Sequence, residues 1–155
     1  MINLLYVYPL YQMIFLTENK IQLDEEKANK DLALRYHKNI FQEGKLEVAD
    51  EVLSPDFVIH NPDLPEELRK GAEGVKKYAS ALIAAVSDRN LVQDDVFAKG
   101  DKVLIRWSNS GTSIGPLLDH KPTGKRHVAT GFDLFRISNG KIMELWQQYK
   151  FENWQ

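Results

Sequence analysis

The hydrophobic periodicity of this chain changes once, near Asp88, from the 3.6-residue repeat of helices to the two-residue alternation of strands. Before Asp88, the clearest helical stripe begins at Gly71, after two other helical segments and one brief strand. Helices that precede a run of strands predict an α+β fold with an antiparallel sheet. Four alternating runs follow Asp88: Leu91–Ala98, Val103–Ser110, Lys125–Ser138 and Ile142–Phe151.

The first helix of the domain is expected to begin at the acidic triplet 24–26, because negative charge is favourable at a helix N-terminus. Gly44 predicts its end, since glycine is the usual residue just after a helix. Residues at three- and four-residue spacing predict its inward side: Ala33, Tyr36 and Ile40, with His37 and Phe41 beside them.

A short second helix is expected over residues 46–53 and ends before Pro55. Phe57–His60 is then a brief strand, which the Asn61-Pro62 pair terminates. The third helix begins at Gly71 and carries a regular apolar stripe.

Two tight turns connect the strands in pairs. Asn139-Gly140 lies between two alternating runs and is the strongest short hairpin signal, and Lys99-Gly100-Asp101 joins the first pair. We expect a cone: a curved mixed or antiparallel sheet wrapped on three N-terminal helices, with an apolar pocket at the open end.

The first 16 residues, MINLLYVYPLYQMIFL, are almost wholly apolar. We treat residues 1–20 as an N-terminal extension and residues 21–155 as a single domain. The run is shorter than the roughly 20 residues that span a bilayer, and it lacks the basic start and cleavage site of a signal peptide. Three interpretations stay open: an edge strand or arm packed on the body or on a second subunit, an extension from a start codon upstream of Met13, or a weak membrane anchor.

Composition excludes several functional classes. The absence of cysteine excludes disulfides, thiolate metal sites and a cysteine nucleophile, and it is compatible with a reducing cytoplasm. A net charge of −2 with scattered Lys and Arg argues against nucleic acid as a partner. The four histidines lack ligand spacing, and no dinucleotide or phosphate-binding motif is present. We therefore expect no metal, no cofactor, no membrane span and a cytoplasmic location.

Five segments, in order and at suitable spacing, resemble the SnoaL-like polyketide cyclase family of the nuclear-transport-factor-like superfamily. They are FVIHNP at 57–62, GAEGV at 71–75, VLIRW with GT at 103–112, PTGK at 122–125, and GFDLFRI through ELW at 131–146. The resemblance covers residues 28–150 and implies the cone fold. It also implies cofactor-free acid/base chemistry, an aldol-type cyclisation or an isomerisation, on a small hydrophobic carbonyl compound.

Two departures from the family pattern concern polar positions. Ser113 stands where the family often has histidine, and Lys150 stands where an acid often follows the last tryptophan. These differences favour the alternative that the chain is a non-catalytic binding module for a small apolar ligand. A dimerisation domain with a vestigial pocket is a third hypothesis.

Asp133 is the leading candidate for a catalytic residue. It lies within a strand, where aspartate is disfavoured, and alternation places it opposite Arg136 and toward the pocket. A carboxylate in apolar surroundings is poorly solvated and can exchange a proton. The resemblance implies that Asp133 takes a proton from an activated carbon. The structural alternative is an aspartate that bonds to a buried Trp or Tyr.

His60 is the second catalytic candidate, because an imidazole at the end of the first strand could polarise a carbonyl or pair with Asp133. The alternative is a histidine that caps the Asn61-Pro62 turn. Asn61 could donate a hydrogen bond to a substrate oxygen, although asparagine before proline is also common in turns.

Five further residues are candidates for substrate contacts. The two tryptophans would wall a flat ligand and offer indole N–H groups. A tyrosine on the first helix holds an oxyanion in ketosteroid isomerases, which the resemblance relates in fold. Phe135 and His127 share the strand face of Asp133. The five candidates are therefore Trp107, Trp146, Tyr36, Phe135 and His127.

Apolar residues also occupy the sheet face opposite Asp133. Phe132 and Leu134 lie there by alternation, and we assign Met143, Leu145 and Tyr149 to the same face of the neighbouring strand. Two apolar faces are more than one core requires, so the sequence predicts a homodimer that covers the outer face.

Overall fold

The computed structural model describes residues 4–152, with side chains described for residues 7–152. The helical elements are α1 (Leu4–Arg35), the π-helix η1 (Tyr36–Gln42), α2 (Val48–Val52), the 3₁₀-helix η2 (Glu66–Leu68) and α3 (Gly71–Ala85). The strands are β1 (Leu53–His60), β2 (Val86–Lys99), β3 (Lys102–Ser113), β4 (Arg126–Ser138) and β5 (Lys141–Glu152). Helices segregated before four long strands confirm the α+β class.

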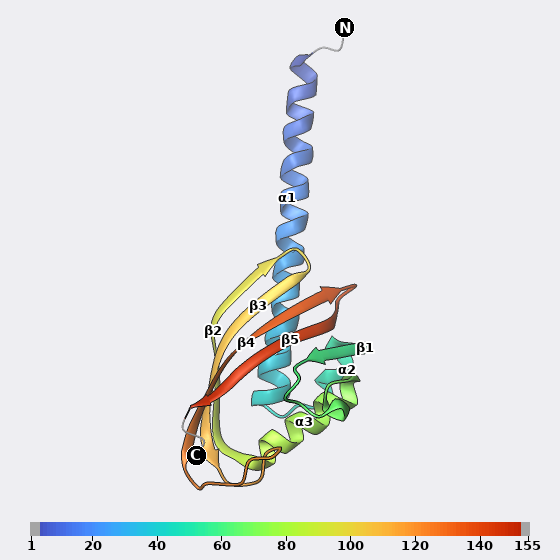
Figure 1. Ribbon diagram of the computed structural model, residues 1–155. Coiled ribbons are helices and arrows are strands. Elements are labelled where there is room, and N and C mark those ends of the chain that lie inside the picture. Colours follow the sequence, from blue (N-terminus) through green and yellow to red (C-terminus); the bar gives the residue numbers. More distant parts are fainter. Residues whose placement is uncertain (1–3, 153–155) are drawn as a thin grey trace.

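The strands form one mixed sheet in the order β1-β5-β4-β3-β2. The strand β1 runs parallel to β5, and the other three pairs are antiparallel. The sheet is curled but not closed, and α3 and the lower part of α1 lie against its concave side (Figure 1). Asn139 and Gly140 both have positive φ, 52° and 68°, as a two-residue hairpin turn requires.

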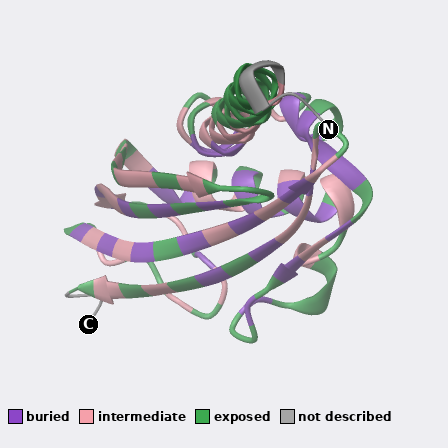
Figure 2. Cartoon of the chain, turned by 90° about the horizontal axis from the view of Figure 1, so that it is seen from above, coloured by how far each residue is buried: buried purple, intermediate pink, exposed green. Residues whose placement is uncertain are grey.

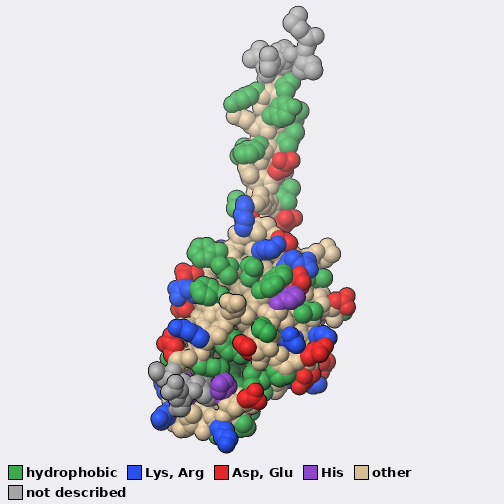
Figure 3. Space-filling view, in the orientation of Figure 1, with side chains coloured by type: hydrophobic (Ala, Val, Ile, Leu, Met, Phe, Trp, Pro, Cys, Tyr) green, Lys and Arg blue, Asp and Glu red, His purple; other side chains and the backbone are tan. Residues whose placement is uncertain are grey.

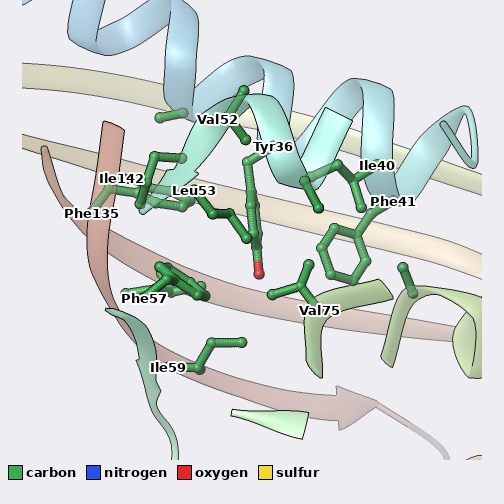
Figure 4. Close-up of a cluster of buried hydrophobic side chains, with 14 of the residues drawn as sticks. Tyr36, Ile40, Phe41, Val52, Leu53, Phe57, Ile59, Val75, Phe135 and Ile142 are labelled. Atoms are coloured by element: carbon green, nitrogen blue, oxygen red, sulfur yellow. The ribbon is translucent and has the colours of Figure 1, made fainter. Parts of the chain in front are cut away.

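The core lies between the helices and the concave face of the sheet (Figure 4). Burial alternates along the strands, as expected when one face is covered (Figure 2). On β4, odd-numbered residues such as Asp133 and Phe135 point inward, and even-numbered residues such as Phe132 point outward.

The predicted outward orientation of Leu145 and Tyr149 on β5 is wrong. Leu145 is completely buried on the concave side, and the Tyr149 ring lies 6.2 Å from that of Trp107, also on the concave side. The register between β4 and β5 shifts between Arg136 and Ile137. A bulge of this kind inserts a residue into one strand and changes which residues face inward beyond it.

The N-terminal segment is helical, so the edge-strand interpretation is wrong for the described residues. α1 begins at Leu4, and residues 8–20 are exposed along a helix that extends away from the body (Figure 1). Contact with the sheet begins further on, where Glu26 accepts a hydrogen bond from the Gly100 backbone N–H and Asn29 donates one to the Gly100 carbonyl. Within the described residues, no helix has the length and hydropathy needed to cross a membrane.

We expect deletion of residues 1–16 to leave the fold intact, because residues 8–16 are exposed on the part of α1 that extends away from the body (Figure 1). The midpoint of thermal unfolding, followed by circular dichroism, should shift by less than about 2 °C, which is less than a 1 kcal/mol change would give. A longer deletion, of residues 1–29, also removes Glu26 and Asn29 and should lower the midpoint clearly. A large loss of stability in the shorter deletion would show that the segment contributes to the core.

Candidate functional site

A carboxylate and an imidazole meet in the interior, between the helices and the sheet. Asp133 on β4 is 1% exposed and His37 on η1 is 3% exposed, and 2.9 Å separates Asp133 Oδ2 from His37 Nε2. Gln147 on β5 places its Nε2 3.5 Å from the same carboxylate oxygen. The other oxygen, Asp133 Oδ1, has no hydrogen-bond partner within residues 4–152. One carboxylate oxygen is therefore held by the protein and the other is available.

The π-helix η1 brings His37 to this position. Its turns are widened, and the Glu43 backbone N–H bonds to the Lys38 carbonyl five residues earlier. The consecutive residues Tyr36 and His37 are both buried. His37 was not among the site residues predicted from the sequence. The only signal in the sequence was its position next to Tyr36 on the inward side of the first helix.

A chain of hydrogen bonds orients the Gln147 amide toward the carboxylate. The Asp63 backbone N–H donates to Asn61 Oδ1 at 2.9 Å, which leaves the Asn61 amide nitrogen to donate to Gln147 Oε1 at 3.2 Å. Gln147 must then present its own N–H group to Asp133. Asn61 thus lies behind Gln147 and is not among the residues that line the cavity described next.

A cavity of about 40 Å³ adjoins the Asp133–His37 pair, several times the volume that one water needs. Helices and strands both line it: Tyr36, His37, Phe41, Tyr78, Leu82, Leu91, Trp107, Asn109, Asp133 and Gln147.

Five buried polar atoms of this lining have no hydrogen-bond partner among the described residues. They are Tyr36 Oη, His37 Nδ1, Trp107 Nε1, Asn109 Oδ1 and Asp133 Oδ1. Buried polar atoms in proteins are almost always paired, because an unpaired one costs free energy. All five atoms belong to residues that line the cavity beside Asp133, which indicates a place for a molecule that both donates and accepts hydrogen bonds.

Two tyrosines on the helical side keep their protons at neutral pH. Burial raises the pKa of Tyr36 well above its usual value, and the negative charge of Asp133 raises it further. Burial likewise raises the pKa of Tyr78 well above its usual value, with a smaller contribution from Tyr149. Both hydroxyls can therefore act as hydrogen-bond donors.

Trp107 occupies the concave face, as predicted, and lines the cavity. Its ring lies over Gly131 on β4, where an added Cβ would come within 2.5 Å of the indole Cζ2. Only glycine at this position lets the tryptophan lie so close to the strand.

Phe135 and His127 face inward as predicted, but neither lines the cavity beside Asp133. Phe135 packs behind the pair, with its ring 5.4 Å from that of Tyr36 and 5.8 Å from that of His37. His127 is buried at a separate, smaller cavity, where its Nε2 bonds to the Thr123 hydroxyl. The predicted contacts of these two residues with the substrate stay predictions, because neither side chain lines the cavity beside Asp133.

His60 and Trp146 are also misplaced by the sequence analysis, because both lie on the outer face of the sheet. Their rings stack at 4.8 Å, and His60 Nε2 is 3.1 Å from Glu144 Oε1. The inward residues are Ile59 on β1, and Leu145 and Gln147 on β5, so the residues next to them point outward. His60 therefore does not pair with Asp133, and His37 does.

The two departures from the family pattern lie outside the cavity. Ser113 is fully buried and its Oγ accepts a hydrogen bond from the Thr123 backbone N–H at 3.2 Å. Lys150 is on the outer face with its side chain 73% exposed. Neither substitution changes the lining of the cavity. Within the described residues, no cluster of three or more His, Asp or Glu side chains could hold a metal ion.

Comparison with known proteins gives one family and several similar folds. The sequence model of the SnoaL-like polyketide cyclases matches residues 31–151. TsrD from Streptomyces laurentii is 26% identical with a TM-score of 0.70, over 80% of this chain and 89% of its own.

Two further structures, below 25% identity, are alike in fold alone. A candidate polyketide cyclase from Acidithiobacillus ferrooxidans is 24% identical with a TM-score of 0.69, over 79% of this chain and 88% of its own. An LEH-like epoxide hydrolase from Mycobacterium tuberculosis is 14% identical with a TM-score of 0.62, over 81% of this chain and 85% of its own. The comparison with curated proteins gave no match.

We expect Tyr36→Phe to preserve or raise stability at neutral pH, because it removes a buried hydroxyl without a partner. It should also reduce the loss of stability in alkali. The pKa of Tyr36 is raised in the folded state, so above about pH 10 only the unfolded chain releases this proton, and the free energy of unfolding falls as pH rises.

Urea unfolding of both proteins at neutral pH and at about pH 10.5 measures this difference. The fall in the free energy of unfolding between the two pH values should be smaller in Tyr36→Phe but should persist, because the pKa of Tyr78 is raised as well. A less stable variant at neutral pH would show that the Tyr36 hydroxyl is held by a partner in the free protein.

Proposed function

Because the chain belongs to the SnoaL-like polyketide cyclase family, we propose that it is a cofactor-free acid/base enzyme that acts on a small hydrophobic carbonyl compound. One observation carries the proposal: five unpartnered buried polar atoms, two of them on the Asp133–His37 pair, converge on a single cavity. The remaining lining is largely aromatic and aliphatic, which suits an apolar molecule with one or two polar groups.

Asp133 is the proposed general base. Its Oδ2 is held by His37 and Gln147, which orient the carboxylate and stabilise its charge. Its Oδ1 is free to take a proton from a carbon next to the substrate carbonyl. The C–H electron pair then delocalises onto the carbonyl oxygen as an enolate, and Asp133 holds the proton until it is returned.

Hydrogen-bond donors to the enolate oxygen come from two walls of the cavity. The Tyr36 hydroxyl and the Trp107 indole N–H are buried, unpartnered and part of the same lining. Preorganised donors aimed at a developing negative charge stabilise the transition state more than the substrate. The enolate carbon then attacks a second carbonyl in a cyclisation, or is reprotonated at another position in an isomerisation.

Asn61 supports the site through Gln147 and does not touch the substrate in this proposal. We also propose a cytoplasmic location, with which the absence of cysteine is compatible.

The proposed chemistry can be tested with acetone, the smallest ketone, because the cavity beside Asp133 has a volume of about 40 Å³. In D₂O, nuclear magnetic resonance measures deuterium uptake at the carbons beside its carbonyl. We expect the wild-type chain to accelerate uptake, and Asp133→Asn to reduce the acceleration by about 100-fold or more, since proton transfer by a positioned group contributes that much.

Glu144→Gln is the matched control, because Glu144 also forms a pair with a histidine, His60, but on the outer face of the sheet. This variant should keep the wild-type rate. Equal loss of activity in both variants would show that the effect is not specific to the cavity. Binding of acetone that raises the thermal midpoint without any exchange would favour the binding module instead, and neither binding nor exchange would favour a vestigial pocket.

We further propose that the outer face of the sheet forms a homodimer. Register aligns one apolar row across four strands, and its residues are partly or fully exposed. The row runs Phe97, Leu104, Leu134 and Trp146. Phe132 lies beside it and is 53% exposed. An apolar patch of this extent on one sheet face is typical of a surface that a partner covers.

Sedimentation at micromolar concentration should give about twice the 17.9 kDa mass of the chain. Leu134→Glu places a charge in the middle of the row and should give a monomer, because an unpaired charge is costly at an apolar interface. Asn90→Glu, an exposed position of the edge strand β2, should stay dimeric. A monomeric wild-type chain would contradict the proposal.

A further inference from the structure

The part of α1 that leaves the body is apolar on its surface. Every residue from Tyr8 to Lys20 is exposed, and the helix extends from the body into solvent with apolar side chains along it (Figure 3). The exposed large apolar residues of this part are Tyr8, Leu10, Tyr11, Met13, Ile14, Phe15 and Leu16. We call residues 4–16 the α1 tip. Apolar surface of this extent marks an interaction site.

Apolar residues surround the α1 tip instead of forming one stripe. Met13, Ile14, Phe15 and Leu16 are consecutive, and each is between 48% and 66% exposed. Successive residues of an α-helix are about 100° apart, so four in a row circle the helix completely. A second helix in a coiled coil would cover only one stripe and leave the others in water. A helix that is apolar all round is instead covered by a continuous apolar medium.

Charge divides α1 at one point. The first 17 residues contain no charged side chain, whereas Glu18, Lys20 and the triplet 24–26 follow within nine residues. The uncharged part also carries three tyrosines, whose amphipathic rings are favoured where hydrocarbon meets water. We call residues 18–29 of α1 the charged stem. An uncharged tip followed by this charged stem matches the boundary between a bilayer and the surrounding water.

The length of the α1 tip limits how it can meet a bilayer. Its 13 residues measure about 20 Å at 1.5 Å per residue. The hydrocarbon core is about 30 Å thick, so the α1 tip reaches into one leaflet without crossing. This agrees with the absence of a membrane-crossing helix among the described residues.

We propose that the α1 tip inserts into one leaflet of a lipid bilayer and tethers the domain to the membrane surface. The body is held off the bilayer by the charged stem, which docks on the β2–β3 hairpin through Glu26 and Asn29. The inference is independent of the proposed catalytic function.

Flotation of the full chain with phosphatidylcholine vesicles tests the proposal, because these lipids carry no net charge and report apolar insertion alone. The wild-type chain should float with the vesicles, and the bound fraction should not change when salt is raised, since apolar burial is not screened. The double variant Leu10→Glu with Phe15→Glu should bind on the order of 100-fold more weakly, because it places two charges in hydrocarbon.

A matched control lies further along the same helix. Ile21 and Leu23 are 54% and 65% exposed, as exposed as the residues of the tip, but they follow the first charged residues. The double variant Ile21→Glu with Leu23→Glu should bind vesicles as the wild-type chain does. Equal loss of vesicle binding in both double variants would contradict the insertion of the α1 tip in particular.

Two other outcomes also overturn the proposal. If the wild-type chain does not float and sediments as an oligomer that Leu10→Glu with Phe15→Glu dissociates, a second copy covers the α1 tip. If the wild-type chain does not float and both double variants sediment as it does, the α1 tip has no role as a contact surface. Circular dichroism of all variants at equal concentration shows whether the domain itself stays folded.

Discussion

The contact between His37 and Asp133 joins the helical layer to the concave face of the sheet, at a depth where neither side chain meets water. A buried carboxylate is tolerated only when hydrogen bonds replace its hydration. Here His37 and Gln147 bond to one oxygen, and the other oxygen adjoins the cavity. The position of η1 against the sheet, the orientation of the Gln147 amide and the polar character of the cavity all depend on this arrangement.

Two His–carboxylate pairs within residues 4–152 have nearly equal N···O distances, 2.9 Å for His37–Asp133 and 3.1 Å for His60–Glu144, but opposite surroundings. His37 and Asp133 are enclosed by aromatic rings, whereas His60 and Glu144 are in contact with solvent on the outer face. Arg136 also bonds to Glu144, and together with His60 it lowers the pKa of that carboxyl group. Glu144 therefore stays charged and committed to its neighbours, while Asp133 keeps one oxygen open to a bound molecule. The difference in environment separates a surface ion pair from a candidate catalytic group.

Part of the candidate site could be read from the sequence. Asp133 and Trp107 face inward because strand alternation is strict along β3 and β4, and Tyr36 follows from helical spacing. The predicted inward orientation of His60 and Trp146 is wrong because each lies one residue away from an inward position, and a shift of one residue reverses the face of a strand. Helical spacing placed His37 on the inward side of the first helix, next to Tyr36, but its partner Asp133 lies 96 positions further along the chain, so no local pattern marked His37 as a site residue.

Local periodicity and turn chemistry are enough to predict the α+β class, the third helix and the two hairpins from the amino-acid sequence. It did not reveal that α1 continues through the apolar segment to Leu4, since an uninterrupted apolar run has no period that separates a helix from a strand. Tertiary packing sets which histidine meets Asp133 and which aromatic residues enclose the cavity. These contacts join residues about 100 positions apart, and their geometry depends on sheet register and helix packing, which no local pattern encodes.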